Sequence, residues 1–410
     1  MKINSLLILI FACLQGSFST EYDDDGIFRI PLQRMETGLE KLLRQEADIK
    51  LIEGIYEMAR QGAEGSKLVL KDGKFVPTND TLPLFKYFDS EYYGLVNIGK
   101  PGKTFKMIMD TAWAYSWVIS SECPRTSLPC AVHQSYNHKT SSTYQPDGRD
   151  FNVANEFMGY MSKDVFLVGQ MNTTGQGFAE LTHLPWIYTM YDSDGTIGLG
   201  FQELAHNATP FFYNLIRQNR LKEPIFSFYI NRDPTTTRGG SLFFGGIDPK
   251  HNKTAFSTIN VNSNVYWQFP VTKISVVMSK KSQVDVCKNG CNALADTSTN
   301  GIMGPAAEIK VINQLIGAER IFFSDRYLIP CTQEYKGPKI VFNINNQEYM
   351  IKGRDYIQKM SYSGITICLS AFRPATGLAN NTWTLGGAFF YQYYTAFDVI
   401  NRQILIADAA

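Results

Sequence analysis

The sequence has almost no net charge and no long hydrophobic run. Its 39 Lys and Arg residues nearly balance 38 Asp and Glu, so the formal net charge of +1 gives no reason to expect nucleic acid or an anionic membrane surface as a partner. No apolar stretch is long enough to span a bilayer, and no collagen, coiled-coil or solenoid period is present. With 410 residues, 44% hydrophobic and 19% charged, the chain has the composition of a globular protein large enough for two domains.

The amino terminus has the three parts of a secretory signal peptide. Lys2 is the basic part, residues 6–14 are apolar, and Ser17 and Ser19 are small residues suited to a cleavage site. The apolar part is too short to cross a membrane. The sequence therefore predicts a signal peptide over residues 1–19 and a soluble mature protein in a secretory compartment.

Cysteine is scarce, with seven residues in the whole chain. Cys13 lies in the predicted signal peptide, and an even number of six in an oxidising compartment suggests disulfides, for which the sequence alone permits fifteen pairings. A zinc site at Cys287 and Cys291 is the competing interpretation, although no second close cysteine pair or histidine cluster supports it.

Two short acidic motifs divide the chain into matching halves. Asp110-Thr111-Ala112 follows an apolar strand pattern, and Asp296-Thr297-Ser298 follows another. Each motif is followed at almost the same distance by an apolar run ending in glycine, within residues 195–200 and 383–387. A duplicated chain of this kind predicts two lobes that share a cleft and bring two carboxylates face to face.

Other motifs occur in a consistent order around the two Asp motifs, at residues 91–99, 141–144, 225–229, 239–248 and 393–398. In this order and spacing the chain resembles the pepsin-like aspartic proteases, especially their cathepsin D-like members, over nearly its whole length. The resemblance implies a mostly β, bilobal fold with a cleft between two homologous lobes. It also implies a monomer that binds a peptide or protein in the cleft and needs no metal or other cofactor.

The resemblance further divides the chain into an activation propeptide over residues 20–80, an N-terminal lobe over 81–250 and a C-terminal lobe over 251–410. Residues 28–34 resemble the opening strand of the family's propeptide, and residues 35–61 have helical spacing of apolar residues. No propeptide lysine can be assigned to the carboxylates, and a solvated helix without a specific role is the alternative. In the mature part, residues 265–271 and 339–344 are expected strands, and 210–220 and 306–316 are expected helices.

Covalent features follow from the resemblance and from short motifs. The resemblance implies three disulfides, joining Cys123 to Cys130, Cys287 to Cys291 and Cys331 to Cys368. Asn-x-Ser/Thr sequons predict surface glycosylation in a secreted chain, at Asn79, Asn172, Asn207, Asn252 and Asn380. Both a secreted and a lysosomal destination fit these features.

The chemistry expected of the site follows from two neighbouring carboxylates. Two such groups cannot both ionise easily, so they share a proton, and one activates water as a general base while the other protonates or polarises the carbonyl. Asp110 and Asp296 are the candidate catalytic residues, and two buried Asp that merely join the lobes are the alternative. Candidate substrate-binding residues are Thr111, Ala112, Asn155, Thr297, Ser298 and Thr299.

Four departures from the family pattern surround these residues. Ala112 and Ser298 replace glycines, and Trp113 replaces a hydroxyl residue that donates to the first carboxylate, whereas Thr299 keeps that donor for Asp296. The family's flap motif, Tyr-Gly-Ser/Thr-Gly, has no counterpart, and Asn155 lies near the expected flap tip. Because a flap excludes water and orders the scissile bond, we expect weak or absent catalysis and a peptide-binding glycoprotein. An active acid endopeptidase is the alternative, so enzymatic activity is left open here.

Overall fold

The structure is a computed structural model that describes residues 26–35, 67–71, 74–78, 92–205, 208–231, 238–321, 325–362, 365–375 and 381–410. The expected signal peptide, nearly all of the expected helical segment at 35–61 and three sequons, Asn79, Asn207 and Asn380, lie outside these residues. Among the described sequons, Asn172 is exposed and Asn252 is half-buried.

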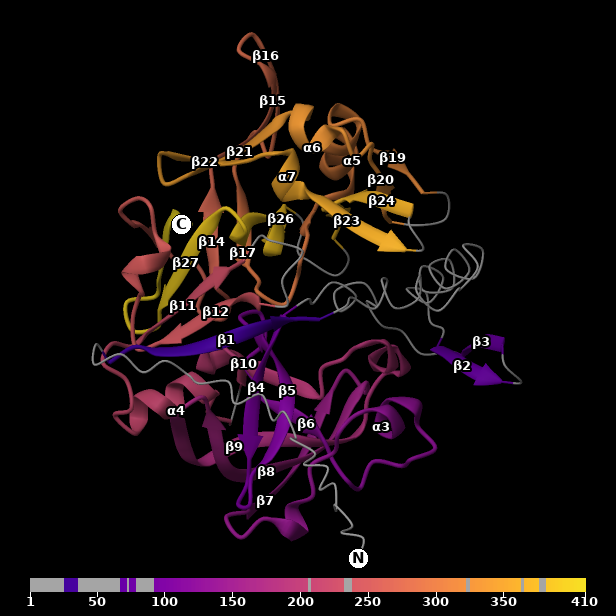
Figure 1. Cartoon of the computed structure of the whole chain (residues 1–410), viewed down its shortest axis with the longest axis vertical. Coiled ribbons are helices and arrows are strands. Elements are labelled where there is room, and N and C mark those ends of the chain that lie inside the picture. The colour runs from indigo at the N-terminus through magenta and orange to yellow at the C-terminus, as the bar shows by residue number, and fades with distance from the viewer. Residues whose placement is uncertain are drawn as a thin grey trace, which may run out of the picture.

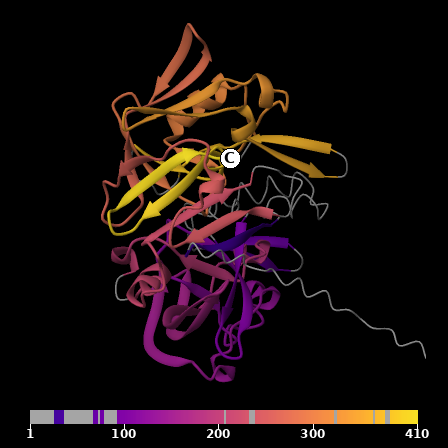
Figure 2. The same cartoon turned by 60° about the vertical axis from the view of Figure 1, so that its left-hand side comes forward.

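Strands dominate the described residues and form two lobes, which confirms the expected mostly β, bilobal fold (Figures 1 and 2). The largest sheet has 13 strands and runs through both lobes. In spatial order its strands are β13 (Ser257–Asn260), β28 (Gln403–Asp408), β27 (Tyr393–Asp398), β11 (Ile225–Ile230), β12 (Arg238–Phe244), β1 (Phe28–Arg34), β4 (Tyr92–Ile98), β5 (Lys103–Asp110), β10 (Gly195–Gly198), β6 (Trp117–Ile119), β9 (Met171–His183), β8 (Phe157–Val168) and β7 (Gln145–Val153).

The C-terminal lobe adds three smaller sheets, in the upper part of Figure 1. A five-stranded sheet contains β14 (Gln268–Val271), β17 (Cys291–Ala295), β26 (Thr382–Leu385), β18 (Ile302–Gly304) and β25 (Phe372–Pro374). One four-stranded sheet contains β16 (Ser282–Val286), β15 (Lys273–Ser279), β21 (Lys339–Ile344) and β22 (Gln347–Ile351). The other contains β19 (Glu319–Arg320), β20 (Tyr327–Leu328), β24 (Ile365–Ser370) and β23 (Ile357–Tyr362). A separate hairpin pairs β2 (Lys67–Lys71) with β3 (Lys74–Thr78).

Helices are few and short in the described residues. The two expected helices are present as α4 (Phe211–Arg217) and α5 (Ala306–Leu315), each preceded by a proline that suits a helix start. Of the two expected strands, β21 matches residues 339–344, whereas β14 begins only at Gln268. The remaining helices are α3 (Leu128–Val132), η1 (His138–Thr140), η2 (Trp186–Met190), η3 (Gln202–Ala205), η4 (Pro249–His251), α6 (Gln333–Lys336), α7 (Gly353–Tyr356) and α8 (Gly387–Phe390).

One hydrophobic core continues from lobe to lobe beneath their junction. Trp267 is buried in it, with its ring 4.1 Å from that of Phe201 and 5.0 Å from that of Phe397. Its Nε1 donates a hydrogen bond of 3.0 Å to the carbonyl of Leu199, in the other half of the chain. Burial of such a side chain contributes about 2–3 kcal/mol, so this contact fixes how the lobes meet.

The expected propeptide strand is an integral part of the large sheet. β1 pairs antiparallel with β12 over most of its length and with β4 at its end, and it crosses the middle of the molecule in Figure 1. Ile30 and Leu32 are buried on it, and Arg29 donates from Nε to Asp248 at 2.8 Å. The strand expected at 28–34 is therefore confirmed.

Three disulfides have the pairing that the resemblance implied. They join Cys123 to Cys130, Cys287 to Cys291, and Cys331 to Cys368. The zinc interpretation of Cys287 and Cys291 is wrong, because both sulfurs are bonded to each other and are not available as thiolate ligands. None of the helices within the described residues is long and apolar enough to cross a membrane.

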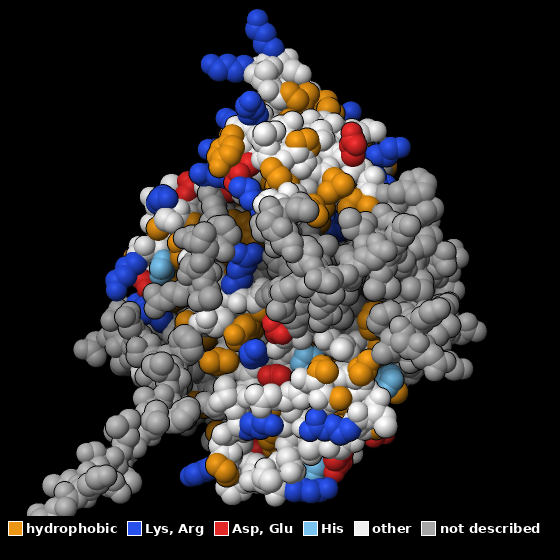
Figure 3. Space-filling model, turned by 45° about the vertical axis from the view of Figure 1, so that its right-hand side comes forward, with side chains coloured by type: hydrophobic (Ala, Val, Ile, Leu, Met, Phe, Trp, Pro, Cys, Tyr) orange, Lys and Arg blue, Asp and Glu red, His pale blue; other side chains and the backbone are white. Residues whose placement is uncertain are grey.

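Charges of both signs are spread over the face in Figure 3, among scattered hydrophobic side chains. Basic side chains project at the top of this view, where the β15–β16 hairpin extends from the C-terminal lobe. Lys280 and Lys281 at the turn of this hairpin are exposed. This small basic tip lies on the opposite side of the C-terminal lobe from the lobe junction.

Candidate active site

The fold places the two Asp motifs in equivalent positions. β5 ends at Asp110 and runs parallel to β10, in which Gly198 lies opposite Asp110. β17 ends at Ala295 and runs parallel to β26, and the amide of Asp296 donates to the carbonyl of Leu385 at 3.0 Å. A Cβ atom at Gly198 or at Gly386 would collide with the loop that follows the Asp of the same lobe. The glycines found after each Asp motif are therefore needed to let these loops pack closely.

Thr111 and Thr297 bring the two motifs together. The Oγ1 of Thr111 accepts from the amide of Thr297 at 3.0 Å and donates to the carbonyl of Ala295 at 2.8 Å. The Oγ1 of Thr297 accepts from the amide of Thr111 at 3.2 Å and donates to the carbonyl of Met109 at 2.6 Å. This reciprocal set of hydrogen bonds joins the lobes next to both carboxylates.

Asp296 lies in a strongly hydrogen-bonding pocket of its own loop. It is 1% exposed, and one carboxylate oxygen, Oδ1, accepts from the amide of Ser298 at 3.0 Å and from its hydroxyl at 2.7 Å. The other oxygen accepts from the hydroxyl of Thr299 at 3.1 Å. The donor expected at Thr299 is therefore present.

Asp110 lies in a loop with less polar side chains. It is 5% exposed, and its Oδ1 accepts from the amide of Ala112 at 2.8 Å. Trp113 takes the place of the expected hydroxyl residue, and its half-buried ring lies 6.2 Å from those of Tyr115 and Phe157. The Nε1 of Trp113 is buried without a hydrogen-bond partner in the described part of the chain. The position of a donor is thus filled by an aromatic ring.

The substituted glycines do not strain the backbone. Ala112 and Ser298 are absent from the residues with positive φ, so both adopt conformations open to any L-residue. Their amides still donate to Asp110 and Asp296. The change at these positions is therefore the added side chain, which is a methyl group in one loop and a hydroxyl donor in the other.

The hairpin of β7 and β8 occupies the place expected of a flap. Its turn contains Ala154 and Asn155, with φ of 55° and 58°, and the amide of Glu156 donates to the carbonyl of Val153 at 3.0 Å. Asn155 is exposed, and its hydrogen bonds are with Asn152 of the same hairpin. The structure therefore groups the other candidate residues around the two Asp motifs but leaves Asn155 at the hairpin tip.

Aromatic rings fix the base of this hairpin. Phe151 on β7 packs edge-on against Tyr115, with ring centroids 5.1 Å apart, and Phe157 on β8 lies 5.9 Å from Trp117. Tyr160, further along β8, hydrogen bonds instead with the buried carboxylate of Glu180 at 3.2 Å. Aromatic packing thus holds the base of the hairpin against the rest of the N-terminal lobe.

Two features of the second Asp loop were not anticipated from the sequence. The hydroxyl of Ser298 is a direct donor to Asp296, two residues earlier in the same loop. Asn300 is 5% exposed and accepts from the hydroxyl of Tyr391 at 2.6 Å, and Tyr92 in turn donates to Tyr391 at 3.3 Å. The first feature could have been inferred from local spacing, whereas the second joins segments far apart in the sequence.

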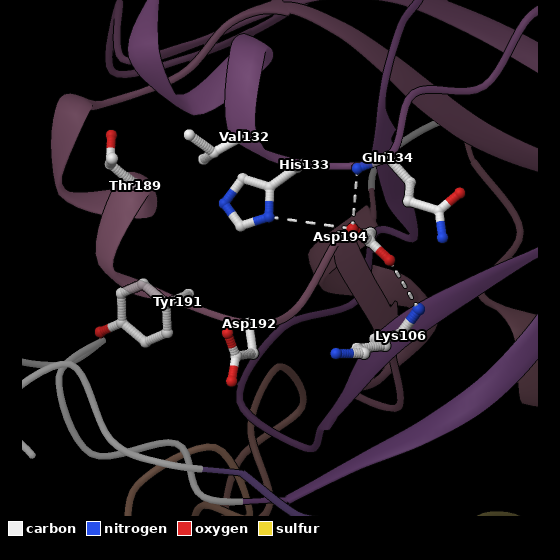
Figure 4. A pocket seen from close by; sticks show the side chains of 8 residues that line it. All are labelled: Lys106, Val132, His133, Gln134, Thr189, Tyr191, Asp192 and Asp194. Atoms are coloured by element: carbon white, nitrogen blue, oxygen red, sulfur yellow. Dashed lines mark hydrogen bonds and ion pairs between the residues drawn. The ribbon is translucent and has the colours of Figure 1, made fainter. Parts of the chain in front are cut away.

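A polar pocket of about 340 Å³ lies elsewhere in the N-terminal lobe (Figure 4). Asp194 at its wall accepts from the amides of Lys106 at 2.9 Å and Gln134 at 3.0 Å, and its Oδ1 is 3.8 Å from Nδ1 of His133. The ammonium of Lys106 lies 5.4 Å from the ring centroid of Tyr93. These contacts tie β5, which leads to Asp110, to the segment that leads into β10.

Within the described residues, no group of three or more His, Cys, Asp and Glu side chains is arranged to hold a metal ion. The groups that donate to Asp110 and Asp296 from their own loops are hydroxyls and backbone amides.

Comparison with known proteins gives the family. The model of the eukaryotic aspartyl protease family matches residues 91–409. The chain belongs to this family. Cathepsin D of Homo sapiens is 34% identical over 100% of both chains, and cathepsin D of Gallus gallus is 32% identical over 98% of both. Cathepsin D of Chionodraco hamatus is 34% identical over 81% of this chain and 84% of its own length.

This aspartyl protease family member has two Asp motifs at the junction of its lobes. The loops after Asp110 and Asp296 are joined by Thr111 and Thr297, and both carboxylates are buried at the junction of the lobes. The two loops differ in the side chains next to the carboxylates, which are Ala112 and Trp113 in one and Ser298 and Thr299 in the other.

Proposed function

We propose that this chain is a secretory-pathway aspartyl protease homologue that binds peptides between its lobes and hydrolyses them slowly or not at all. The observation that supports this best is the contrast between the two Asp loops. Ser298 and Thr299 supply hydroxyl donors to Asp296, whereas Trp113 supplies an indole ring beside Asp110. We infer from this contrast in the side chains of the two loops that hydrolysis is slow or absent.

In the proposed reaction, Asp110 and Asp296 hold one proton between them. The ionised carboxylate removes a proton from a water molecule as its oxygen attacks the scissile carbonyl carbon, and the protonated one donates to the carbonyl oxygen. The resulting tetrahedral diol collapses when the leaving nitrogen is protonated and the C–N bond breaks. The products are a carboxylic acid and an amine, and the shared proton is restored.

The hairpin of β7 and β8 is the second argument for slow hydrolysis. A flap that closes over substrate excludes water and orders the scissile bond. Here the exposed tip residue Asn155 bonds within the hairpin, and Phe151 and Phe157 pack against the N-terminal lobe. A hairpin held in this way can cover a bound peptide but offers no hydroxyl group at its tip to orient it.

Peptide binding is assigned to backbone and side-chain groups around the dyad. The proposed contacts come from residues next to the two acids and from the hairpin tip, namely Thr111, Ala112, Asn155, Thr297, Ser298 and Thr299. The three disulfides and the exposed sequon residue Asn172 support a secretory route and a glycoprotein. Residues 1–19 and 20–80 are proposed as the signal peptide and the propeptide, followed by lobes over 81–250 and 251–410.

An active acid endopeptidase is the second candidate function. The reciprocal hydrogen bonds of Thr111 and Thr297 favour it, because they hold the two Asp loops in register. The amides of Ala112 and Ser298 also remain in place as donors. Under this alternative the altered side chains would change specificity rather than rate.

A proteolysis assay at acid pH distinguishes the two candidates. The purified protein, carried through acid activation, is incubated with denatured protein between about pH 3 and 6 beside an Asp110→Asn control. The proposal predicts little or no hydrolysis together with saturable binding of peptides at acid pH. Hydrolysis at the rate of an ordinary acid protease, abolished by Asp110→Asn, would establish the second candidate instead.

A further inference from the structure

We propose that Arg402 is a positioning residue for the two Asp motifs. It holds the ring of Phe201 against that of Trp267, and this aromatic pair connects the two motifs from behind. The inference rests on the proposed function, because the spacing of the two acids matters for the peptide binding proposed there. It goes further by assigning a role to a side chain that belongs to neither Asp loop.

The chain on the Phe201 side of the aromatic pair is bonded to the first Asp loop. The amide of Leu199 donates to the carbonyl of Asp110 at 2.8 Å, and the amide of Gly200 donates to the carbonyl of Trp113, also at 2.8 Å. Phe201 follows these two residues directly in the sequence. Any displacement of the Phe201 ring is therefore transmitted to the backbone that carries Asp110.

The Trp267 side of the aromatic pair is bonded to the second Asp motif. The carbonyl of Trp267 accepts from the amide of Ala295, the residue before Asp296, at 2.9 Å. Its ring lies 4.1 Å from that of Phe201, and its Nε1 donates to the carbonyl of Leu199 at 3.0 Å. The relative position of the two motifs thus depends on how these two rings meet.

Arg402 contacts this arrangement from the turn between β27 and β28. Its guanidinium carbon lies over the ring of Phe201, 5.0 Å from the centroid. Nη2 donates to the carboxylate of Glu203, and Nη1 donates to the side-chain oxygen of Asn264 at 3.1 Å. A cation over an aromatic ring is attracted by the electrons of its face, and the planar guanidinium can make hydrogen bonds at the same time. Arg402 therefore joins both halves of the chain beside the aromatic pair.

The backbone of Arg402 is fixed in an uncommon conformation. Its φ is 52°, in the left-handed region that few residues other than glycine adopt. Its carbonyl accepts from the amide of Val261 at 3.0 Å, and the amide of Asn401 donates to Asp398 at 2.9 Å. Such a conformation persists where the surrounding structure fixes it. In Figure 1, β27 lies above β1 and β10 lies below it, so this turn contacts the chain after β10 across the junction of the lobes.

The ion pair with Glu203 is the weaker part of the contact. The side chains of Arg402 and Glu203 are 34% and 45% exposed, and an exposed ion pair contributes little free energy because water and salt screen it. The ring of Phe201, in contrast, is fully buried. We therefore expect the position of Phe201 to depend on the cation over its ring more than on the carboxylate beside it.

Native-state hydrogen exchange of the full chain tests this role. We expect Arg402→Ala to accelerate exchange of the amides of Leu199, Gly200 and Ala295 by about fivefold, the effect of losing one cation–aromatic contact. The amides that pair β8 with β9 should exchange as before. Equal acceleration of all amides would show a general loss of stability and would overturn the inference, as would unchanged exchange at the three named amides.

Matched variants identify the part of Arg402 that acts. Arg402→Lys keeps a cation that can lie over the ring and should restore most of the protection, whereas Glu203→Gln should change exchange less than Arg402→Ala does. Arg220→Ala removes an exposed arginine elsewhere and should have no effect. Arg402→Gln, which keeps hydrogen-bonding groups without the charge, gives the same comparison if Arg402→Ala does not fold. Full protection in Arg402→Gln would contradict the role of the cation.

Peptide binding provides a second measurement, with a fluorescently labelled digest of denatured protein as the probe at acid pH. We expect Arg402→Ala to bind it several-fold more weakly than the parent protein, and Arg402→Lys and Arg220→Ala to bind it about as tightly. Absence of binding by the parent protein would refute the proposed peptide-binding function, and hydrogen exchange would still decide the role of Arg402. Equal binding by the parent and a folded Arg402→Ala would overturn the inference.

Discussion

Thr111 and Thr297 exchange hydrogen bonds across the junction of the lobes, each hydroxyl accepting from the amide of the other residue. Each hydroxyl also donates to a carbonyl beside the opposite Asp motif. The two Asp motifs are therefore held together by the threonine side chains next to the carboxylates. This arrangement makes the geometry of the dyad depend on the contact between lobes.

Replacing Thr111 with Val removes that contact with little change in volume. The buried carbonyl of Ala295 and the amide of Thr297 would lose their partner, and each unsatisfied group costs roughly 1–3 kcal/mol. We expect a lower midpoint in urea unfolding and a loss of peptide binding at acid pH. Thr332→Val, at an exposed threonine without a capping hydrogen bond, is the control and should leave both unchanged. Wild-type stability in Thr111→Val would contradict the proposed joining role.

Ala112→Gly combined with Trp113→Ser tests the cause of slow hydrolysis. The double change provides a hydroxyl donor near Asp110 and removes the methyl group from the first loop. One regained hydrogen bond to a charged group corresponds to about a tenfold or larger gain in acid-dependent peptide hydrolysis. The readout is the initial rate on a peptide substrate at acid pH.

That double variant also loses the packing of Trp113 against Tyr115 and Phe157, so its unfolding must be measured in parallel. A well-folded variant with no gain in rate would place the main defect in the β7–β8 hairpin. A hairpin rebuilt with a tyrosine near its tip would then be needed as well.

Acid should weaken the docking of β1. Burial acts to raise the pKa of Asp248, but hydrogen bonds from Arg29 and from the amide of Lys250 outweigh it and hold the pKa below its ordinary value of 3.8. A carboxyl with a lowered pKa stabilises the fold above the unfolded-state pKa, and this contribution is lost as pH falls through the folded-state value. Hydrogen exchange of β1 amides in the full chain should therefore accelerate at the lowest pH.

Arg29→Gln should remove most of that pH dependence. Because Gln carries no charge, the pKa of Asp248 is lowered less, although the amide of Lys250 and His251 still lower it, and β1 amides should already exchange faster near pH 6. An unchanged pH dependence in Arg29→Gln would show that other carboxyl groups govern the docking of β1.

Glu180 is expected to be a stabilising residue of the N-terminal lobe. Its buried carboxylate accepts from the hydroxyls of Ser162 at 2.7 Å and Ser120 at 3.0 Å, and His138 lies 3.2 Å away. Glu180→Gln puts an amide donor where these donors need an acceptor, and should cost about 1–3 kcal/mol in urea unfolding. Glu348→Gln, at an exposed position, is the matched control. Equal midpoints for the two variants would rule out this role.

Local sequence patterns alone predicted much of the fold and of the candidate site. The repeated Asp-Thr motifs, each after an apolar strand and before a distant glycine, predicted two lobes with paired acids, because strand ends and tight turns depend on neighbouring residues. Helices α4 and α5 were predicted in the same way, from the spacing of apolar residues, and a proline precedes each of them. Local spacing did not predict where β14 begins, because Trp267, the residue before it, packs into the core between the lobes.

Only the tertiary structure decided how the acids are supported. The donation from Ser298 to Asp296 depends on the path of one loop, and the bonds between Thr111 and Thr297 join residues that lie in different lobes. The ring of Trp113 finds its place through contacts with Tyr115 and with Phe157 of the hairpin. The sequence determined which groups are present near the dyad, but their distances and directions depend on how two separately folded loops pack, which no local pattern records.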